Sequence, residues 1–400
     1  MHLCAERSNR IALGDSNRRG RITQQFIQMY SESPQLWVQA PGRVDLMGSH
    51  TDYNEGFVLT QSIDRNTWIA VSPREDNKIR ISSMNARGSA EVDLADIRHN
   101  PTASWADYVS GVAAVFKQKG YQLKGFNGLI HSTIPFSSGL SSSAALEVAS
   151  AVLFVHLGDL QIVPVDIAKL CQRAEREFVG VNCGILDQYS STMGKVGQVL
   201  LLDCRCIYSE TSPIADEVQV VICDTCKPRM LTGSEYQERQ IQCEQGTAIL
   251  SRFYPDIHSL RDVNLEQLDA HKDDLPAIVT SRCRFIIQEN QRVLDMANAL
   301  AKPDFDQIKL LTSESFAGAR DLYQISCSEM DEMYAAMTSS GAIGARQAGA
   351  GFGGCMLALV HPEHLDAFIN SVHDLYLTKT DIKPEVFPVT TSPGAGMMSQ

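Results

Sequence analysis

The sequence predicts an α+β fold divided into two lobes. Strand-like and helix-like segments are mixed along the 400 residues rather than strictly alternating, which favours an α+β arrangement. The hydrophobic fraction is 44% and the charged fraction 20%, as in globular proteins, and at roughly 150 residues per domain the length suits two or three domains. Beyond Gly194 the character of the chain changes and long helical stretches dominate. We expect an N-terminal arm at residues 1–34, an N-terminal lobe at 35–197 and a C-terminal lobe at 198–400.

The first lobe is expected to begin with strands. Residues 1–33 are polar and are interpreted as a partly loose arm. The short apolar segments that follow are separated by turn residues such as Pro41-Gly42. Further along, apolar residues recur at helical spacing. The expected elements are strands at 36–38, 44–47, 56–59, 68–71, 79–82, 90–94 and 129–134, and helices at 105–117, 142–157 and 165–178.

The second lobe combines a few strands with a long helical region. Its strands are short and rich in Val, Ile and Leu. A glycine-rich segment at 341–354 leads directly into one of them. The expected elements are strands at 199–203, 218–224, 355–360 and 386–391, and a helical stretch, broken at several points, from 234 to about 337.

The charge balance argues against a polyanion as the main partner. With 35 Lys and Arg against 47 Asp and Glu, the formal net charge is −12. Nucleic acid binding requires a basic face, so no nucleic acid partner is expected, although a small anion held by backbone amides is compatible. Apolar stretches such as 218–223 are far short of the roughly 20 residues that cross a bilayer, so no membrane partner is expected.

The cysteines indicate a reduced, cytoplasmic protein. There are eleven, scattered along a large chain, and no apolar segment of a secretory signal follows the basic residues near the N-terminus. Cys223 and Cys226, with Cys204 and Cys206 upstream, have a spacing that zinc sites also use. Because they lie in or beside strand-like runs, we favour ordinary thiols over a metal site.

A loop rich in glycine and serine joins a strand to a helix at residues 135–145. Gly139 and the hydroxyl residues Ser141, Ser142 and Ser143 stand at the expected helix start. A helix N-terminus leaves about four backbone N–H groups unpaired and carries the positive end of the dipole, so an anion is stabilised there. One or two serines would explain a helix cap, but three in succession exceed that need. The segment is not a Walker loop, because the Gly-Lys-Ser/Thr ending is absent.

A second glycine-rich loop, residues 349–354, formally matches G-x-G-x-x-G. A dinucleotide-binding fingerprint follows a strand and opens a helix, whereas this loop runs into the strand expected at 355–360. We therefore expect only a close approach of its backbone to a ligand or to another loop.

Hydrogen-bonding side chains gather in the segment 42–54. Arg43 lies on an expected strand, and His50, Asp52 and Asn54 follow in a turn. Single residues of these types are most often ordinary turn residues. The whole cluster suits a polyhydroxylated ligand, because each hydroxyl requires a partner.

Asp187 is a candidate general base. It follows Gly184 and apolar neighbours, a setting in which a carboxylate is shielded from water. Glu175 precedes it by 12 residues, near the end of its helix. Taken alone, the neighbourhood of Arg173 and Arg176 indicates that Glu175 is a solvated surface charge.

Four motifs in a fixed order carry a resemblance to a known family. They are Pro-Gly-Arg-Val-Asp-Leu-Met-Gly-Ser-His-Thr-Asp-Tyr-Asn from residue 41, Gly-Leu-Ser-Ser-Ser-Ala from 139, Cys-Gly-Ile-Leu-Asp-Gln from 183 and Gly-Ala-Gly-Phe-Gly-Gly from 349. From about Gln35 to the C-terminus the chain resembles the galactokinase family of the GHMP small-molecule kinases. The resemblance implies a two-lobed α+β GHMP kinase fold, with a ribosomal-protein-S5-like N-terminal lobe, a C-terminal α+β sandwich lobe and the active site in the cleft between them.

The resemblance also implies an ATP-dependent sugar 1-kinase that converts D-galactose and ATP to galactose 1-phosphate and ADP. Asp187 corresponds to the aspartate that accepts the anomeric proton, and Arg43 to the arginine that keeps it ionised and offsets charge on the phosphoryl group. Mg²⁺ is the implied cofactor, with Ser143 and Glu175 as its ligands. The implied sugar contacts are Arg43, Ser49, His50, Thr51, Asp52, Gly184, Asp187 and Tyr236, and the implied ATP contacts are Trp105, Ser137, Ser138, Gly139, Leu140, Ser141, Ser142 and Ser143.

Two positions depart from the family pattern. Ser49 stands where galactokinases usually carry a Glu that is expected to bind the C6 hydroxyl, and Asp45 where they usually carry Asn. Loss of a carboxylate at position 49 weakens recognition of a hydroxymethyl group and removes repulsion toward a substrate carboxylate. Galacturonate, and L-arabinose, which lacks C6, are therefore alternative substrates. Asp45 either pairs with Arg43 or points away along the strand.

A non-catalytic sensor of galactose and ATP on the same fold is a further alternative. Such relatives tend to have lost residues of the phosphate loop, whereas this chain retains Gly-Leu-Ser-Ser-Ser-Ala and Asp187. A GHMP kinase for mevalonate or homoserine is disfavoured by the loop from His50 to Asp52. We expect a monomer or a weak dimer whose partners are a sugar and ATP.

Overall fold

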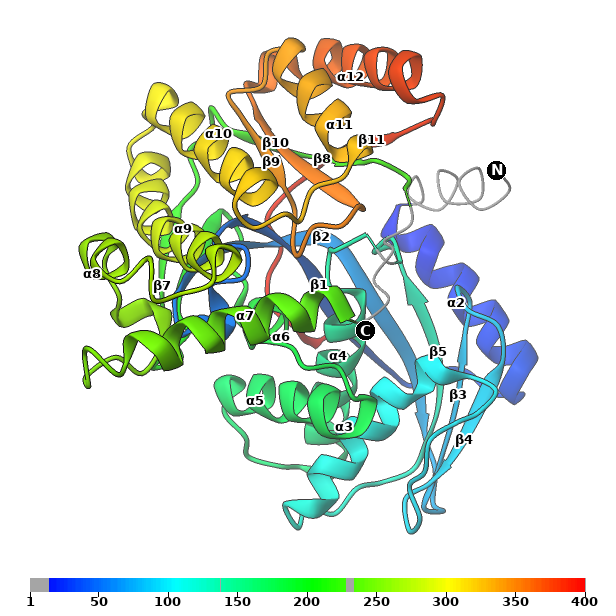
Figure 1. Ribbon diagram of the computed structural model, residues 1–400. Helices are drawn as coiled ribbons and strands as arrows, with labels where there is room; N and C mark the ends of the chain where they lie inside the picture. The colour runs from blue at the N-terminus through cyan, green and yellow to red at the C-terminus, as the bar shows by residue number, and fades with distance from the viewer. Residues whose placement is uncertain (1–13, 137, 228–233, 400) are drawn as a thin grey trace.

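The computed structural model describes residues 14–136, 138–227 and 234–399. In this part of the chain the larger of two sheets has eight strands (Figure 1). These strands are β1 (Leu36–Met47), β2 (Phe57–Pro73), β3 (Lys78–Ser83), β4 (Ser89–Asp93), β5 (Phe126–Ser132), β6 (Gln198–Asp203), β7 (Tyr208–Pro213) and β12 (Gly396–Met397). Their order is β12-β1-β2-β5-β3-β4, with β6 paired to β2 and β7 to β6. Only β3 and β5 pair in parallel, so the sheet is a mixed one, as expected of an α+β protein.

The pair β1 and β2 differs from the expectation of short, separate strands. Pro41-Gly42 is not a turn: β1 continues through it, with a shift in register between Pro41 and Arg43. Such a bulge re-aims the side chains that follow it. A Cβ on Gly42 would lie 2.6 Å from the carbonyl oxygen of Leu140. Glycine here lets the serine-rich loop approach the strand that carries Arg43.

The larger sheet is covered by helices on both faces. The covering helices are α2 (Asp15–Tyr30), α3 (Asp107–Gln118), α4 (Ser142–Gly158), α5 (Pro164–Ala174) and α6 (Leu186–Met193). On β2, Ile69 and Val71 pack into the main core with residues of α3 and α4, whereas Trp68 and Ala70 pack with residues of α2. Because successive strand residues point to opposite faces, α2 and α4 lie on opposite sides of the sheet. Helices α3, α5 and α6 pack against α4.

Within the segment predicted to be a polar, partly loose arm, residues 15–30 form helix α2. Its buried apolar residues are only Ile22 and Phe26, too few for a clear helical pattern. Arg18 anchors it instead: the buried guanidinium donates to His131 and Asn66 and lies 3.9 Å from the ring centroid of Trp68. The buried Arg18 side chain therefore makes the packing contact that an apolar residue makes in most helices.

The smaller sheet has the strand order β11-β8-β10-β9, and all its neighbouring strands are antiparallel. One face packs on α11 and α12, and the other on the core shared with α9 and α10, which makes a sandwich (Figure 1). The predicted broken helical stretch is confirmed. The elements of this region are β8 (Gln219–Asp224), α7 (Ser234–Leu250), α8 (Leu265–Ala270), α9 (Ala277–Ala301), α10 (Phe305–Asp321), α11 (Ser328–Ser339), β9 (Gly344–Gln347), β10 (Cys355–Val360), α12 (Leu365–Thr380) and β11 (Glu385–Val389).

The two sheets do not divide at residue 197. Strands β6 and β7 follow that residue yet extend the larger sheet, and β12, near the end of the chain, pairs with β1. The domain boundaries 1–34, 35–197 and 198–400 therefore stay a prediction. They do not coincide with the division of the strands between the two sheets. No helix among the described residues is both long and apolar enough to cross a membrane.

Of the four cysteines considered for a metal site, Cys204, Cys206 and Cys223 are free thiols. Cys223 is buried in β8 and Cys226 follows it, while Cys204 and Cys206 belong to the turn between β6 and β7. Within residues 14–136, 138–227 and 234–399, no group of three or more His, Cys, Asp and Glu side chains is placed to hold a metal ion.

Candidate active site

A cavity of about 740 Å³ lies where the two lobes meet. It is lined by β1, by the serine-rich loop at the start of α4, by the segment before α6, by α7 and by the glycine-rich loop before β10. The predicted residues that line it are Arg43, Ser49, His50, Asp52, Gly139, Ser141, Ser142, Ser143, Glu175, Gly184, Asp187 and Tyr236.

Arg43 connects the candidate base to the serine-rich loop. Its Nη2 lies 2.6 Å from Oδ1 of Asp187, at the start of α6, and its Nη1 donates to the carbonyl of Gly139. Its backbone N–H donates to the carbonyl of Leu140. The side chain of Arg43 is 6% exposed and that of Asp187 33%, so the arginine is fixed in the wall while the carboxylate faces the cavity.

The N-terminus of α4 opens onto the same cavity. Gly139 and Ser141 have positive φ angles of 85° and 63°, which turn the chain sharply before the helix. No side chain caps α4, and the buried Oγ of Ser141 has no hydrogen-bond partner among the described residues. The unpaired backbone N–H groups and the dipole of a 17-residue helix therefore face the space beside Asp187. An anion is the natural occupant of that space.

Among the described residues, the predicted ATP contacts Ser138, Leu140 and Trp105 do not line this cavity. Ser138 donates to the carbonyl of Pro135 and accepts from the backbone of Cys355, which ties the loop to β10. The side chain of Leu140 is buried in the main core. Ser137 lies outside the described residues.

Trp105 lines a second, small cavity of about 40 Å³. Its indole N–H donates to the carbonyl of Arg87, and Phe136 and Leu146 contribute apolar wall. Ser142 lines both cavities, so the small one adjoins the N-terminus of α4.

Glu175 is not a solvated surface charge, which corrects the interpretation from its arginine neighbours. The α-helix α5 gives way to a π-helical segment, Glu175–Val179, that turns Glu175 inward until it is 5% exposed. Its Oε2 accepts from Nε2 of Gln188 at 2.6 Å and from Sγ of Cys183 at 3.2 Å. Burial and the nearby carboxylate of Asp187 raise the pKa of Glu175, so the site disfavours its charge when no cation is close.

The loop 49–54 is held rigidly by its own side chains. His50 has a φ of 65°; its Nε2 lies 2.9 Å from the carbonyl oxygen of Ala350 and its Nδ1 2.8 Å from the hydroxyl of Tyr53. The ring of Tyr236 packs 5.2 Å from that of His50. Thr51 is buried and bonds the carbonyl oxygens at both ends of the loop. His50 therefore forms wall, and Thr51, a predicted sugar contact, points away from the cavity.

The glycine-rich loop before β10 is a hydrogen-bond partner of both His50 and Ser49. Gly349 and Gly351 have φ angles of 84° and 80°, and a Cβ on Gly351 would lie 2.4 Å from the carbonyl oxygen of Ile325. The sequence predicted that the backbone of this loop would closely approach a ligand or another loop. In the structure it packs against another loop at Ile325 and also lines the cavity at Gly349 and Ala350.

Asp52 presents its carboxylate to the cavity beside Gly184. A Cβ on Gly184 would lie 1.7 Å from Oδ2 of Asp52, so only glycine fits there. Burial and the nearby carboxylate of Asp187 raise the pKa of Asp52 to about 7. Because burial disfavours the charge of Asp52, a ligand hydroxyl that donates a hydrogen bond to this carboxylate stabilises it.

Behind Ser49 lies a charged cluster that the sequence did not reveal. Arg346, on β9, is fully buried; it donates to the Oγ of Ser49 at 2.9 Å, to Glu289 at 3.0 Å and to the backbone carbonyl of Asp45 at 3.1 Å. Arg292 bonds the other oxygen of Glu289 at 2.9 Å. These residues lie on three elements remote in sequence, and no motif links them, so only the fold could bring them to light.

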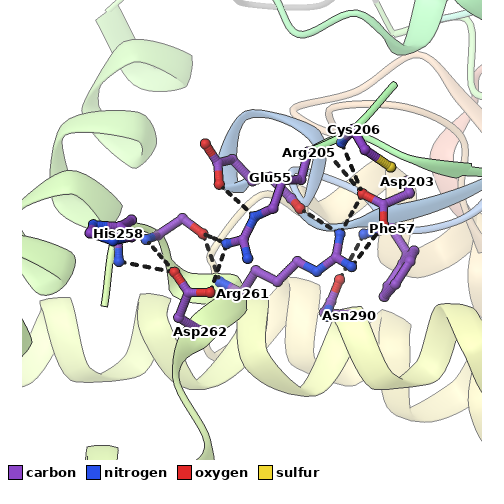
Figure 2. A network of polar contacts seen from close by, with 10 residues as sticks. Glu55, Phe57, Asp203, Arg205, Cys206, His258, Arg261, Asp262 and Asn290 are labelled. Atoms are coloured by element: carbon purple, nitrogen blue, oxygen red, sulfur yellow. Dashed lines mark hydrogen bonds and ion pairs between the residues drawn. The ribbon is translucent and has the colours of Figure 1, made fainter. Parts of the chain in front are cut away.

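A second network holds the segment that directly follows the loop 49–54, at Glu55 and Phe57. Figure 2 shows Arg205 between Glu55 and Asp262, and Arg261 against Asp203. Arg261 bonds both oxygens of Asp203, at 2.6 and 2.8 Å, and lies 3.9 Å from the ring centroid of Phe57. That segment is therefore fixed to both the β6–β7 turn and the helical region before α8.

Matches to family models cover both lobes. The galactokinase galactose-binding signature matches residues 24–73, the N-terminal domain of GHMP kinases residues 107–195, and the C-terminal domain of GHMP kinases residues 296–377. These segments contain, in turn, Arg43 and the loop 49–54, the serine-rich loop with Asp187, and the buried Arg346.

Similar whole proteins agree with these matches. Galactokinases of Roseiflexus sp. and Chloroflexus aurantiacus are each 38% identical, over 94% and 93% of this chain and 96% and 95% of theirs. The crystal structure of Lactococcus lactis galactokinase complexed with galactose matches with a TM-score of 0.91 and 32% identity, over 95% of this chain and 99% of that one. A mevalonate kinase structure, at 18% identity and a TM-score of 0.62, shares the fold. The predicted two-lobed GHMP kinase fold is confirmed, and the chain belongs to the galactokinase family of the GHMP kinases.

Proposed function

We propose that the protein is an ATP-dependent galactokinase, which transfers the γ-phosphoryl group of ATP to the anomeric hydroxyl of D-galactose. The observation that carries the proposal is the Arg43–Asp187 pair, which faces the N-terminus of α4 across one cavity. A carboxylate acceptor, a cation and an anion-binding helix end thus line one cavity. Phosphoryl transfer through a loose transition state needs mainly positioning and electrostatic stabilisation of that kind.

Asp187 acts as the general base. Its carboxylate is held at one oxygen by Arg43 and faces the cavity, so the other oxygen is open to the hydroxyl that attacks. The proton leaves the anomeric oxygen for Asp187 as that oxygen bonds to the γ-phosphorus, and the bond from that phosphorus to the bridging oxygen breaks to release ADP. Arg43 stabilises the carboxylate before transfer and, through its position beside Gly139, offsets charge on the moving phosphoryl group.

The nucleotide occupies the two adjoining cavities. Its phosphates bind at Gly139, Ser141, Ser142 and Ser143, where backbone N–H groups and the unpartnered hydroxyl of Ser141 supply donors. The adenine ring of the nucleotide lies toward Trp105 and Phe136, whose rings offer apolar contact.

Glu175 and Ser143 suit Mg²⁺. Magnesium is bound in kinases by one or two protein oxygens together with substrate phosphates, so a single buried carboxylate beside a serine hydroxyl is a fitting donor set. Bound there, Mg²⁺ would offset the negative charge of the nucleotide phosphates. Gln188 and Cys183 orient the Glu175 carboxylate toward that position.

The sugar lies between the loop 49–54 and α7. Asp52 and Asp187 accept hydrogen bonds from its hydroxyls, Gly184 leaves room for the Asp52 carboxylate, and Tyr236 supplies a flat wall. Galacturonate and L-arabinose are the alternative substrates to be compared. A sensor without activity is disfavoured, because Arg43 bonds both Asp187 and the loop at the N-terminus of α4, an arrangement that suits catalysis.

The test is Asp187→Asn with D-galactose and Mg-ATP. We expect galactose 1-phosphate formation to fall by several orders of magnitude, while ATP binding, measured by calorimetry, stays within about threefold. Near-normal turnover in this variant would remove Asp187 as the base. A wild-type protein that binds both ligands without releasing ADP would instead support the sensor.

We further propose a cytoplasmic protein, monomeric or weakly dimeric. Most cysteines within the described residues, among them Cys171, Cys183, Cys204 and Cys223, are free thiols, which suits a reducing compartment. Sedimentation of the purified protein across concentrations measures the assembly state, and fractionation of cells measures the compartment.

A further inference from the structure

Asp45 is a buried carboxylate that is short of hydrogen-bond donors. It is 1% exposed, and its Oδ1 has no partner among the described residues. Its Oδ2 has one contact, with the hydroxyl of Ser49 at 3.2 Å. The neighbouring Arg346 donates to the backbone carbonyl of Asp45 and not to its carboxylate. A buried carboxylate ordinarily accepts several hydrogen bonds or an ion pair.

The one hydrogen-bond donor near Asp45, the hydroxyl of Ser49, is shared between two acceptors. The hydroxyl of Ser49 has a single hydrogen and two acceptors, Oδ2 of Asp45 at 3.2 Å and the carbonyl oxygen of Gly349 at 3.1 Å. Because Arg346 donates to the Ser49 oxygen, that oxygen already has its incoming bond. Asp45 therefore receives at most a shared hydrogen bond from the protein.

The carboxylate stands on the sugar side of the cavity. Asp45 and Arg43 pair regularly with β2 at Thr60 and Ser62, so they point to the same face of β1. Both line the cavity. Arg43 bonds Asp187 at the reacting end, whereas Asp45, two residues further along the chain, bonds Ser49 at the start of the loop 49–54. Asp45 thus faces the end of the ligand that is remote from the phosphoryl acceptor.

We propose that Asp45 accepts a hydrogen bond from the C6 hydroxyl of the bound hexose and thereby selects an uncharged hydroxymethyl group at that carbon. The inference rests on the proposed function, since it takes the anomeric oxygen to lie at Asp187. The ring hydroxyls are fixed to the pyranose and meet Asp52 first. A hydroxymethyl group projects beyond the ring and rotates, so it reaches a recessed acceptor.

Two consequences follow for the alternative substrates. L-Arabinose brings no donor to Asp45 and leaves it buried and unpaired, which costs affinity. Galacturonate brings a second carboxylate against the first, and like charges in a water-poor cavity repel. The protein therefore rejects a C6 carboxylate even though residue 49 is serine.

The experiment compares Asp45→Asn with wild type on D-galactose, 6-deoxy-D-galactose and 2-deoxy-D-galactose. We expect the substitution to lower kcat/KM by roughly ten- to a hundredfold for the two sugars that carry a C6 hydroxyl, and to leave the 6-deoxy sugar within about threefold. Asp64→Asn makes the same chemical change at a partly exposed position on β2, outside the cavity, and is the matched control.

A loss of the same factor for all three sugars overturns the inference while the proposed function stands. If wild type phosphorylates none of the three, the proposed function falls and this inference with it. Should Asp45→Asn fail to fold, wild type alone carries the test: galacturonate must be used about a hundredfold less well than galactose, and equal use overturns the inference.

Discussion

The carboxylate of Asp52 lies against the α-carbon of Gly184, so closely that a Cβ at 184 would come within 1.7 Å of Oδ2. One residue belongs to the loop after β1 and the other to the segment before α6. The contact sets the width of this part of the cavity, the proposed sugar side, because neither backbone can approach further. It also explains why a glycine precedes the candidate base by three residues.

Gly184→Ala should therefore act on the sugar and not on the nucleotide. The added methyl group must displace the Asp52 carboxylate, so we expect KM for galactose to rise at least about tenfold while KM for ATP stays within about twofold. Gly180→Ala is less suitable as a control because Gly180 has a φ of 87°. Gly396→Ala is suitable, because nothing lies within 4 Å of a Cβ there. Equal changes in both KM values would show a general disturbance of the fold.

The raised pKa of Asp52 predicts a pH-dependent stability. In the unfolded chain the group titrates near 3.8, and in the folded protein near 7. A raised folded pKa stabilises the fold below pH 3.8, and that stabilisation is lost as the pH rises to about 7. Asp52→Asn has no such titration, so the variant should gain stability relative to wild type across this range, by up to a few kcal/mol, and the difference should be constant above it.

Urea unfolding of both proteins at pH 5, 6, 7 and 8 measures this difference. The relevant quantity is the free energy of unfolding of the variant minus that of wild type, which should increase up to about pH 7 and then level off. A difference that is constant from pH 5 to 8 would mean that Asp52 titrates normally. Asp64→Asn, at a partly exposed aspartate, should show no such trend.

Most of the candidate site residues could be predicted from the sequence because they lie in continuous motifs. Arg43, the serine-rich loop and Asp187 each stand in a run of neighbours whose types are meaningful together, and the structure gathers these runs around one cavity. The strand at 355–360 and the helix from Ser142 were also predicted from periodicity and flanking glycines, and both are confirmed.

What escaped prediction depends on contacts between distant segments. The arginine neighbours of Glu175 indicated a surface charge, and only the family resemblance implied a metal ligand there; a π-helical segment turns the residue inward. Helix α2 escaped because Arg18 takes the place of an apolar residue. The buried Arg346 sits between residues of α9, α10 and β1, whose proximity no local pattern encodes.

Arg261→Ala tests the network that holds the segment after the loop 49–54 (Figure 2). The substitution removes two hydrogen bonds to Asp203 and the contact with the ring of Phe57, groups that are mostly buried. We expect unfolding free energy to fall by about 1–3 kcal/mol and KM for galactose to rise several-fold, since Phe57 begins the strand that follows the loop. Arg80→Ala, which breaks an exposed ion pair with Glu91, should change neither quantity measurably.

Glu175→Gln tests the proposed magnesium ligand. A neutral amide binds Mg²⁺ far more weakly than a carboxylate, so the Mg²⁺ concentration for half-maximal activity should rise about tenfold or more. The same shift should appear in the Mg²⁺ dependence of ATP binding measured by calorimetry, without turnover. Glu177→Gln alters an exposed carboxylate two residues along the same π-helical segment and should leave both dependences unchanged. If Glu175→Gln keeps the wild-type Mg²⁺ dependence but unfolds more readily, the buried carboxylate serves the packing of Gln188 and Cys183 and the metal is held elsewhere.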